Sequence, residues 1–347
     1  MLPYWVFYFI PFIGVLFGRR LTASARTTIW WLVGLLLACA IGLRHQVGGD
    51  WPHYLAYLER ASLMTFLEAL FQSDPGYYLV NWMMASFGGA IYWINLVCGS
   101  LLISGIVVFA RRQPLPWLTL LVAVPYLIIV VGMGYTRQAV ALGFLLLGLA
   151  ALSNGKMRLF VVWVLIGAAF HKSAVLMLPV AALASSQKRI WNLVWVGVIS
   201  LIGGYLFLFD SVDRLWTNYV EADYESQGGL IRVLMNAVPA SLYLALHRRL
   251  DLNETERRLW WWMSVFAMVC IPLVMLSSTA TDRVALYLIP LQLFVFSRLH
   301  LITRNTLLRA YIIIGVAAYY AAVQAVWLLF ASHAHLWLPY QMYPFAS

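Results

Sequence analysis

The sequence predicts an all-α polytopic membrane protein with about 11–13 transmembrane helices. Hydrophobic residues make up 63% of its 347 residues, and the mean hydropathy is +0.82. Only 10% of the residues are charged, against about 25% in an average soluble chain. Apolar runs bounded by short charged clusters recur along the whole sequence. We therefore expect residues 1–347 to form a single integral membrane domain, which excludes a secreted domain, a cytosolic enzyme and a nucleic-acid-binding protein.

Several of the apolar runs are shorter than the roughly 20 residues that a helix needs to cross a bilayer. In chain order, the runs that we expect to be spans are Pro3–Gly18, Thr27–Leu43, Ile91–Ala110, Leu115–Met133, Thr136–Leu152, Leu159–Phe170, Ser173–Ala184, Ile190–Phe209, Gly229–Leu246, Leu259–Ser277, Val284–Ser297 and Ala310–Ala331.

The basic residues orient these spans and account for the net charge of +10. Sixteen of the 23 Lys and Arg residues fall in six clusters, and the alternation of the spans places all six on the cytoplasmic side. These clusters are Arg19/Arg20/Arg26, Arg111/Arg112, Lys156/Arg158, Lys188/Arg189, Arg248/Arg249/Arg257/Arg258 and Arg298/Arg304/Arg309. The other seven basic residues and ten of the 13 acids then lie outside. The first span is expected to be retained, because its arginines follow the apolar run, unlike those of a secretory signal.

In two segments the number of spans is ambiguous. Pro75–Phe87 is apolar enough for a span, but counting it would invert every later cluster, so we expect a re-entrant or surface-lying helix there. Leu159–Ala184 could be one long span, but the same argument splits it at His171-Lys172. Polar groups at that depth would face the interior of a bundle or a watery cavity.

The outer segment 44–90 differs from an ordinary linker. Gly48-Gly49 would allow a sharp turn directly before Asp50, and the aromatic residues that follow suit one or two interfacial helices. Arg137 follows the flexible segment Gly132–Gly134 at a helix N-terminus, where an arginine can bind an anionic oxygen or snorkel to headgroups. A second outer loop, 210–228, mixes acids with aromatic residues, as in sugar-binding surfaces or in a merely solvated loop.

No motif for nucleotide or metal chemistry is evident. The sequence has no Gly-rich phosphate loop, no His/Cys ligand spacing and no nucleophile elbow. Its three cysteines, Cys39, Cys98 and Cys270, lie within apolar runs and suit packing. We therefore expect no metal, cofactor or nucleotide.

Three motifs in this order resemble the EpsG-like family of Wzy-type bacterial polysaccharide polymerases, which assemble exopolysaccharide and O-antigen. They are Leu43-Arg44…Val47-Gly48-Gly49-Asp50…Tyr54, then Tyr135-Thr136-Arg137-Gln138…Ala141, then Phe170-His171-Lys172-Ser173-Ala174. A late Asp282-Arg283…Tyr287 and a C-terminal Leu338-Pro339-Tyr340 also fit.

The resemblance implies a GT-C-like glycosyltransferase bundle in the bacterial inner membrane, with its active site facing the periplasm. Its substrates would be oligosaccharide repeat units carried on undecaprenyl pyrophosphate, and a chain-length regulator protein is a possible partner. Two other classes remain open: a transporter or flippase of lipid-linked sugars, and a membrane O-acyltransferase acting on extracellular polysaccharide.

The hypothesis assigns roles to residues on the outer side. Fixed cations would stabilise the charge that grows on the leaving pyrophosphate. The candidates are Arg44, Arg137, Lys172, Arg232 and Arg283. Asp50 or His171 would act as the general base, and the sequence does not choose between them. The family motifs further suggest sugar contacts at Tyr54, Gln138, Asp282 and Tyr340.

Overall fold

The computed structural model describes residues 1–184, 189–208 and 228–346. These residues form helices and connecting turns, and the strand-like pairing among them is one isolated β-bridge between Arg44 and Met342. The chain divides into two compact units. Unit 1 comprises Met1–Phe144, Ala169–His171 and Ile313–Ser347, and unit 2 comprises Leu145–Ala168 and Lys172–Ile312.

The elements of unit 1 come mostly from the first part of the chain. They are α1 (Leu2–Phe17), η1 (Gly18–Arg20), α2 (Ala23–Gly42), α3 (Trp51–Ser62), α4 (Phe66–Leu70), α5 (Pro75–Ser86), α6 (Ile91–Arg111), α7 (Pro116–Ala123), η2 (Val124–Val131), α8 (Gly132–Gly134), the first half of α9 (Thr136–Leu152), most of α18 (Thr306–Phe330) and η9 (Ala334–Leu336).

Unit 2 contains the elements between α9 and α18. They are most of α10 (Met157–Phe170), η3 (Lys172–Met177), α11 (Leu178–Ala184), α12 (Arg189–Leu208), α14 (Gly229–Leu246), η6 (His247–Arg249), α15 (Glu254–Leu276), α16 (Ser278–Ala285), η7 (Leu286–Leu288), α17 (Ile289–Arg298) and η8 (Leu299–Ile302).

Every predicted span overlaps a helix, which confirms the all-α polytopic membrane fold. In the described part of the chain, seven helices are long and apolar enough to cross a membrane: Ala23–Gly42, Ile91–Arg111, Pro116–Gly134, Gly229–Arg249, Glu254–Leu276, Ser278–Ile302 and Thr306–Phe330. Five further apolar helices are shorter: Leu2–Phe17, Thr136–Leu152, Met157–Phe170, Lys172–Ala184 and Ile190–Tyr205. That these five also cross stays a prediction.

Glycines bring the helices of unit 1 close together. A Cβ atom added at Gly42 of α2 would lie 2.5 Å from the Cα of Leu96 on α6. One added at Gly105 of α6 would lie 2.1 Å from the carbonyl oxygen of Gly143 on α9. Small residues serve this purpose in membrane helices, where tight backbone contact replaces the hydrophobic effect. The two contacts fix α6 between α2 and α9.

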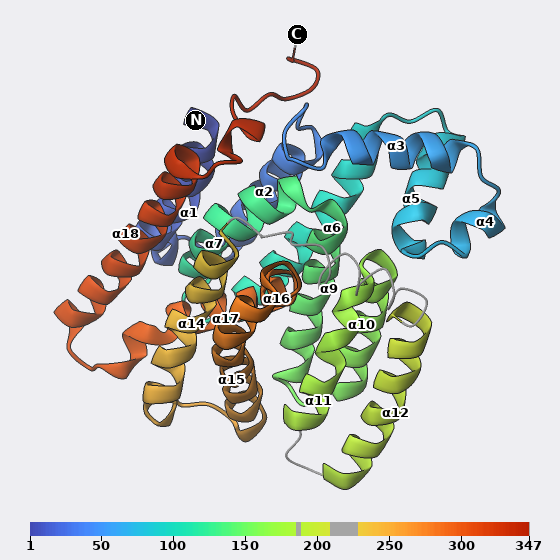
Figure 1. Cartoon of the computed structure of the whole chain (residues 1–347). Coiled ribbons are helices and arrows are strands. Elements are labelled where there is room, and N and C mark those ends of the chain that lie inside the picture. The colour runs from blue at the N-terminus through green and yellow to red at the C-terminus, as the bar shows by residue number, and fades with distance from the viewer. Residues whose placement is uncertain (185–188, 209–227, 347) are drawn as a thin grey trace. The chain divides into compact units, whose positions relative to one another are not determined.

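The N- and C-terminal helices of unit 1 lie side by side (Figure 1). The Tyr8 hydroxyl on α1 donates a hydrogen bond to the Ala317 carbonyl on α18, and the Gln324 amide donates to the Tyr4 carbonyl over 3.1 Å. The Tyr4 hydroxyl then donates to the Trp337 carbonyl over 2.6 Å. These bonds tie α1 to α18 and to Trp337 of the C-terminal segment.

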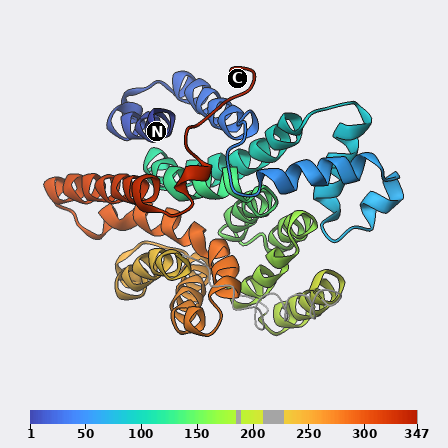
Figure 2. The ribbon, with the colours of Figure 1, turned by 45° about the horizontal axis from the view of Figure 1, so that its top comes forward.

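Segment 44–90, which the sequence predicts to lie outside, contains three short helices, α3 to α5, drawn in blue to cyan (Figures 1 and 2). The Thr65 hydroxyl and the Glu68 carboxylate cap α4 reciprocally. α5 has 12 residues and spans only about 18 Å, too short to cross a bilayer unaided. This agrees with the exclusion of Pro75–Phe87 from the spans, whereas its interfacial or re-entrant location stays a prediction.

The segment Leu159–Ala184 is broken where the sequence predicts. α10 ends at Phe170, His171 is not helical, and a 3₁₀ helix starts at Lys172 and leads into α11. The break also separates the units, because His171 belongs to unit 1 and Lys172 to unit 2. In unit 2, α14 packs against α15 and α17. The predicted acidic and aromatic loop, 210–228, falls outside the described residues apart from Gly228.

Candidate active site

Arg44 joins two of the sequence motifs inside unit 1. Its guanidinium donates through Nη2 to the Thr136 hydroxyl over 2.8 Å and to the Asn95 amide oxygen over 3.3 Å. Nη1 donates to the Ile41 carbonyl over 2.6 Å, and Nε donates to the Val47 carbonyl over 3.2 Å. The end of α2, the start of α6 and the start of α9 are therefore tied to one side chain.

This environment changes the role expected of Arg44. The residue is completely buried, and burial lowers the pKa of its guanidinium. Its guanidinium donates hydrogen bonds to four protein oxygens and has no exposed edge for a phosphate in this structure. Contact of Arg44 with the pyrophosphate finds no support in this geometry, whereas its hydrogen bonds to the Ile41 and Val47 carbonyls fit a role in positioning the loop that carries Asp50.

The turn before Asp50 requires glycine, as the Gly-Gly sequence predicts. Gly48 has a φ of +104°, and its N–H donates to the Leu336 carbonyl over 2.9 Å. A Cβ atom there would lie 2.2 Å from the carbonyl oxygen of Met133. The turn places Asp50 half-exposed at the N-terminus of α3, where its carboxylate accepts a long hydrogen bond of 3.4 Å from the Tyr54 hydroxyl.

Arg137 forms an ion pair that the sequence did not predict. Its Nη1 lies 2.5 Å from the carboxylate of Asp74, whose side chain is 3% exposed, whereas that of Arg137 is 27% exposed. The Tyr57 ring covers the guanidinium at 4.9 Å from its centroid. Asp74 is held at the N-terminus of α5 ahead of Pro75. The pair therefore fixes one side of Arg137 and leaves part of it accessible.

The end of α10 lies against the helix that carries Asp74. A Cβ atom at Gly76 would lie 2.9 Å from the Phe170 ring and 3.1 Å from the Ala169 carbonyl oxygen. His171 follows directly and is half-exposed. The start of the third motif therefore lies against α5 at Gly76. Gly76 is two residues after Asp74, which pairs with Arg137 of the second motif. The predicted outward-open cavity around His171 stays a prediction.

Unit 2 contains a second buried cation–carboxylate pair. Arg232 on α14 donates through Nε and Nη2 to the two oxygens of Asp282 on α16, the latter over 2.7 Å. The Ser173 hydroxyl lies 3.1 Å from the Tyr287 hydroxyl, which joins the His171-Lys172-Ser173 motif to the late motif. Lys172 and Arg283 are half-exposed.

The four residues expected to contact sugar are buried or already bonded to other protein groups. Tyr54 and Gln138 are 2% exposed. Tyr340 donates its hydroxyl to the Ala40 carbonyl over 2.8 Å, and burial raises its pKa to about 12. Asp282 is occupied by Arg232. Tyr340 and Asp282 join separate elements, and Tyr54 and Gln138 are buried, so the assignment of direct sugar contact to these four side chains finds no support in this geometry.

Sequence reasoning missed Asp74, Asn95 and Thr136 as members of the site. Asp74 and Thr136 stand at the start of a helix, a position usually explained by helix capping, and Asn95 lies in the second turn of α6. The only signal was that Thr136 belongs to the second motif; Asp74 lies outside the motifs. Their partners lie 51 to 92 residues away, which a local pattern does not reveal.

Comparison with known proteins identifies the family to which these motifs belong. The family model described as the EpsG family matches residues 27–342, nearly the whole chain. No curated protein and no solved structure matches the chain significantly. The match includes each of the motifs above, from Arg44 to Tyr340. The chain therefore belongs to the EpsG family, a Wzy-like polysaccharide polymerase family.

Proposed function

We propose that this protein joins undecaprenyl-pyrophosphate-linked oligosaccharide repeat units by glycosyl transfer at the periplasmic face of the bacterial inner membrane, as a GT-C-like enzyme. The observation that carries the proposal is the hydrogen bond from Arg44 to Thr136, 92 residues apart, which joins two family motifs beside Asp50 and Arg137. Motifs that converge on one buried hub indicate a shared site rather than separate packing positions.

The reaction needs no nucleotide, because the donor already carries its leaving group. A sugar hydroxyl of the acceptor attacks the anomeric carbon of the donor, and a new glycosidic C–O bond forms. The bond between that carbon and the pyrophosphate oxygen breaks, and undecaprenyl pyrophosphate leaves with the electron pair. The acceptor's proton passes to a base. Negative charge thus develops on the phosphate, where a fixed cation lowers the barrier.

Arg137 is the residue of unit 1 best suited to meet that charge. It is partly exposed, and the Asp74 carboxylate and the Tyr57 ring hold it in place. An arginine presents five N–H donors, so one bond to Asp74 leaves others for a phosphate. A preorganised donor costs no reorganisation when the transition state forms. Lys172, Arg232 and Arg283 are proposed as further cations for the pyrophosphate.

Asp50 is the base that the geometry favours. Its carboxylate is half-exposed at the end of the Gly48 turn, and its bond from Tyr54 is long. Asp74 is a poor candidate, because it is buried against Arg137. His171 is the alternative, and the two are separated by comparing Asp50→Asn with His171→Gln. Full activity in Asp50→Asn together with loss in His171→Gln would transfer the role to His171.

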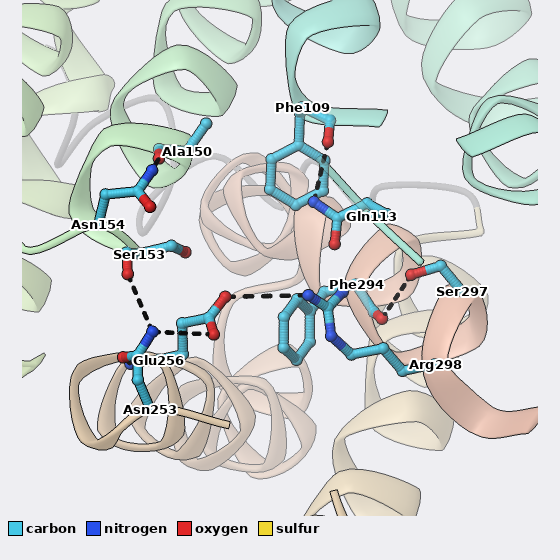
Figure 3. Close-up of polar contacts among 10 residues, drawn as sticks. All are labelled: Phe109, Gln113, Ala150, Ser153, Asn154, Asn253, Glu256, Phe294, Ser297 and Arg298. Atoms are coloured by element: carbon cyan, nitrogen blue, oxygen red, sulfur yellow. Dashed lines mark hydrogen bonds and ion pairs between the residues drawn. The ribbon is translucent and has the colours of Figure 1, made fainter. Parts of the chain in front are cut away.

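A transporter would have to open on the cytoplasmic side, and the contacts in unit 2 argue against this. At the predicted cytoplasmic ends of its helices, Asn253 on the α15 cap donates to the Ser153 carbonyl over 3.2 Å (Figure 3). The Glu256 carboxylate lies 3.8 Å from Arg298, which is 7% exposed and lies over the Phe294 ring. These contacts tie α9, α15 and α17 together on that side.

The product made in cells distinguishes the three classes. In a strain lacking this gene, wild-type protein is expected to restore long surface polysaccharide from accumulated single repeat units. Asp50→Asn protein, expressed to the same level in the membrane, is expected to leave single units on the outer face. Unchanged chain length with repeat units trapped inside would indicate a transporter, and loss of acyl groups alone would indicate an acyltransferase; each result would refute the proposal.

A further inference from the structure

A groove runs along one face of unit 1 between α2 and α6, with a volume of about 470 Å³. Its walls include Trp30, Trp31 and Leu35 of α2 and Ile103, Val107 and Val108 of α6. The volume falls within the 300–1,000 Å³ typical of small-molecule sites.

The floor and the rigid side of the groove are built from small and stacked residues. Gly34, Ala38, Ser100 and Ser104 also line the groove, and their small side chains leave space between the two helices. Trp30 is 2% exposed and stacks on Trp117 at 4.4 Å, so this wall is fixed from behind. Trp31, the next residue of α2, also lines the groove and is 74% exposed. A narrow apolar slot with a fixed wall suits an extended hydrocarbon chain.

Two arginines close one end of this slot. Arg111 and Arg112 line the groove at the C-terminal end of α6, and both are exposed. Basic pockets between transmembrane helices on the cytoplasmic side bind anionic lipid headgroups. Arginine is suited to this because its planar guanidinium binds phosphate through two hydrogen bonds. The groove therefore pairs an apolar slot with an anion-binding end.

The length of the groove matches one leaflet. From Ser100 to Arg111 the helix rises about 16 Å at 1.5 Å per residue, close to half of the roughly 30 Å hydrocarbon core. Arg111 and Arg112 belong to a predicted cytoplasmic cluster, which places the slot in the inner leaflet. Asn95, the partner of Arg44, lies near the other end of α6, so the groove and the candidate active site are at opposite ends of this helix.

We propose that the α2–α6 groove binds one anionic phospholipid of the inner leaflet. An acyl chain lies against Trp31, Ile103 and Val107, and the headgroup phosphate meets Arg111 and Arg112. The lipid has a structural role, because its headgroup phosphate meets arginines at the end of α6 that lies away from Asn95 and Arg44. It does not depend on the proposed polymerase activity.

Native mass spectrometry of the full chain, with phosphatidylglycerol or phosphatidylcholine titrated into detergent, tests the proposal. The wild-type protein is expected to retain one phosphatidylglycerol at least tenfold more tightly than phosphatidylcholine. Arg111→Gln/Arg112→Gln should abolish this selectivity, whereas Lys156→Gln/Arg158→Gln, an equal loss of exposed charge on the same predicted face, should keep it.

A groove-filling variant keeps the test informative if the arginine variant misfolds. Ser104→Trp leaves both arginines in place and should lower the affinity for the tightly bound phosphatidylglycerol about tenfold. Ala322→Trp, at an exposed position of α18, should leave this affinity unchanged. Equal wild-type affinity for the two lipids would overturn the proposal. So would undiminished selectivity in Ser104→Trp, or a groove occupied by a second copy of the chain in a stable dimer.

Discussion

Arg44 and Arg137 are both arginines of the family motifs, yet their surroundings give them different roles. Arg44 is fully buried and bonded to four protein oxygens, whereas Arg137 is 27% exposed and bonded to Asp74. A lysine can replace the charge of either residue but cannot form the planar, multiple hydrogen bonds of a guanidinium. Substitution by lysine should therefore separate a positioning role from a catalytic one.

For Arg137→Lys we expect a lower rate of undecaprenyl pyrophosphate release with little change in thermal stability. Loss of one preorganised donor to the developing charge costs about 2.7 to 4 kcal/mol, a decrease of roughly 100- to 1,000-fold. The rate is measured on protein purified to equal monodispersity. Arg60→Lys is the control, since Arg60 is an exposed arginine of the same α3–α5 region. A wild-type rate in Arg137→Lys would remove the catalytic role of this arginine.

For Arg44→Lys we expect a clear loss of thermal stability, in contrast to Arg137→Lys. A single ammonium group cannot satisfy the carbonyl, amide and hydroxyl acceptors around the guanidinium, and each unsatisfied buried group costs about 1–3 kcal/mol. The apparent Tm in detergent should fall clearly below that of Arg60→Lys, and folded protein should be scarce. If Arg44→Lys were as stable as wild type but inactive, Arg44 would instead contact substrate, as the sequence alone suggested.

At the scale of an element, the turn before α3 depends on one glycine. Gly48 and Gly88 both have positive φ, but only Gly48 is crowded, with the Met133 carbonyl oxygen where a Cβ would lie. At Gly88 nothing lies within 4 Å. Gly88→Ala should therefore cost only the backbone strain of about 1–2 kcal/mol.

Gly48→Ala should destabilise the protein by more than Gly88→Ala and should reduce activity as well, because the turn positions Asp50. Thermal unfolding and product formation, measured for both variants, check this. An equal loss of thermal stability in the two variants, with equal product formation, would mean that the Gly48 turn can shift away from Met133 without consequence for the site.

The elements themselves could be predicted from the sequence, and the contacts between them could not. Hydropathy and charge clusters predicted a helix at each of the apolar runs and the break at His171, because a helix in lipid needs an uninterrupted apolar run. Asp74 was missed because its partner Arg137 is 63 residues away. Tyr54 was expected at a sugar but is buried, since an aromatic pattern does not reveal which face a helix covers.

At the scale of the whole molecule, the topology is the prediction on which the site's location depends. In a variant whose three cysteines are replaced by alanine, Lys172→Cys and Ser332→Cys should react with a membrane-impermeant maleimide added to intact spheroplasts. Asn154→Cys should react only after permeabilisation. These positions lie on the two sides predicted by the alternation of spans. Labelling of Asn154→Cys from outside would invert the scheme and place Arg137 in the cytoplasm.

The central claim is that this chain itself forms glycosidic bonds from lipid-pyrophosphate donors. The most direct measurement is the ratio of undecaprenyl pyrophosphate released to glycosidic bonds formed, using purified wild-type protein and lipid-linked repeat units without nucleotide or added metal. Wild-type protein is expected to release one lipid pyrophosphate per glycosidic bond and to lengthen the oligosaccharides by whole repeat units. Asp50→Asn/His171→Gln protein is expected to do neither. Absence of release by folded wild-type protein, or lengthening only when a nucleotide sugar is supplied, would contradict the central claim.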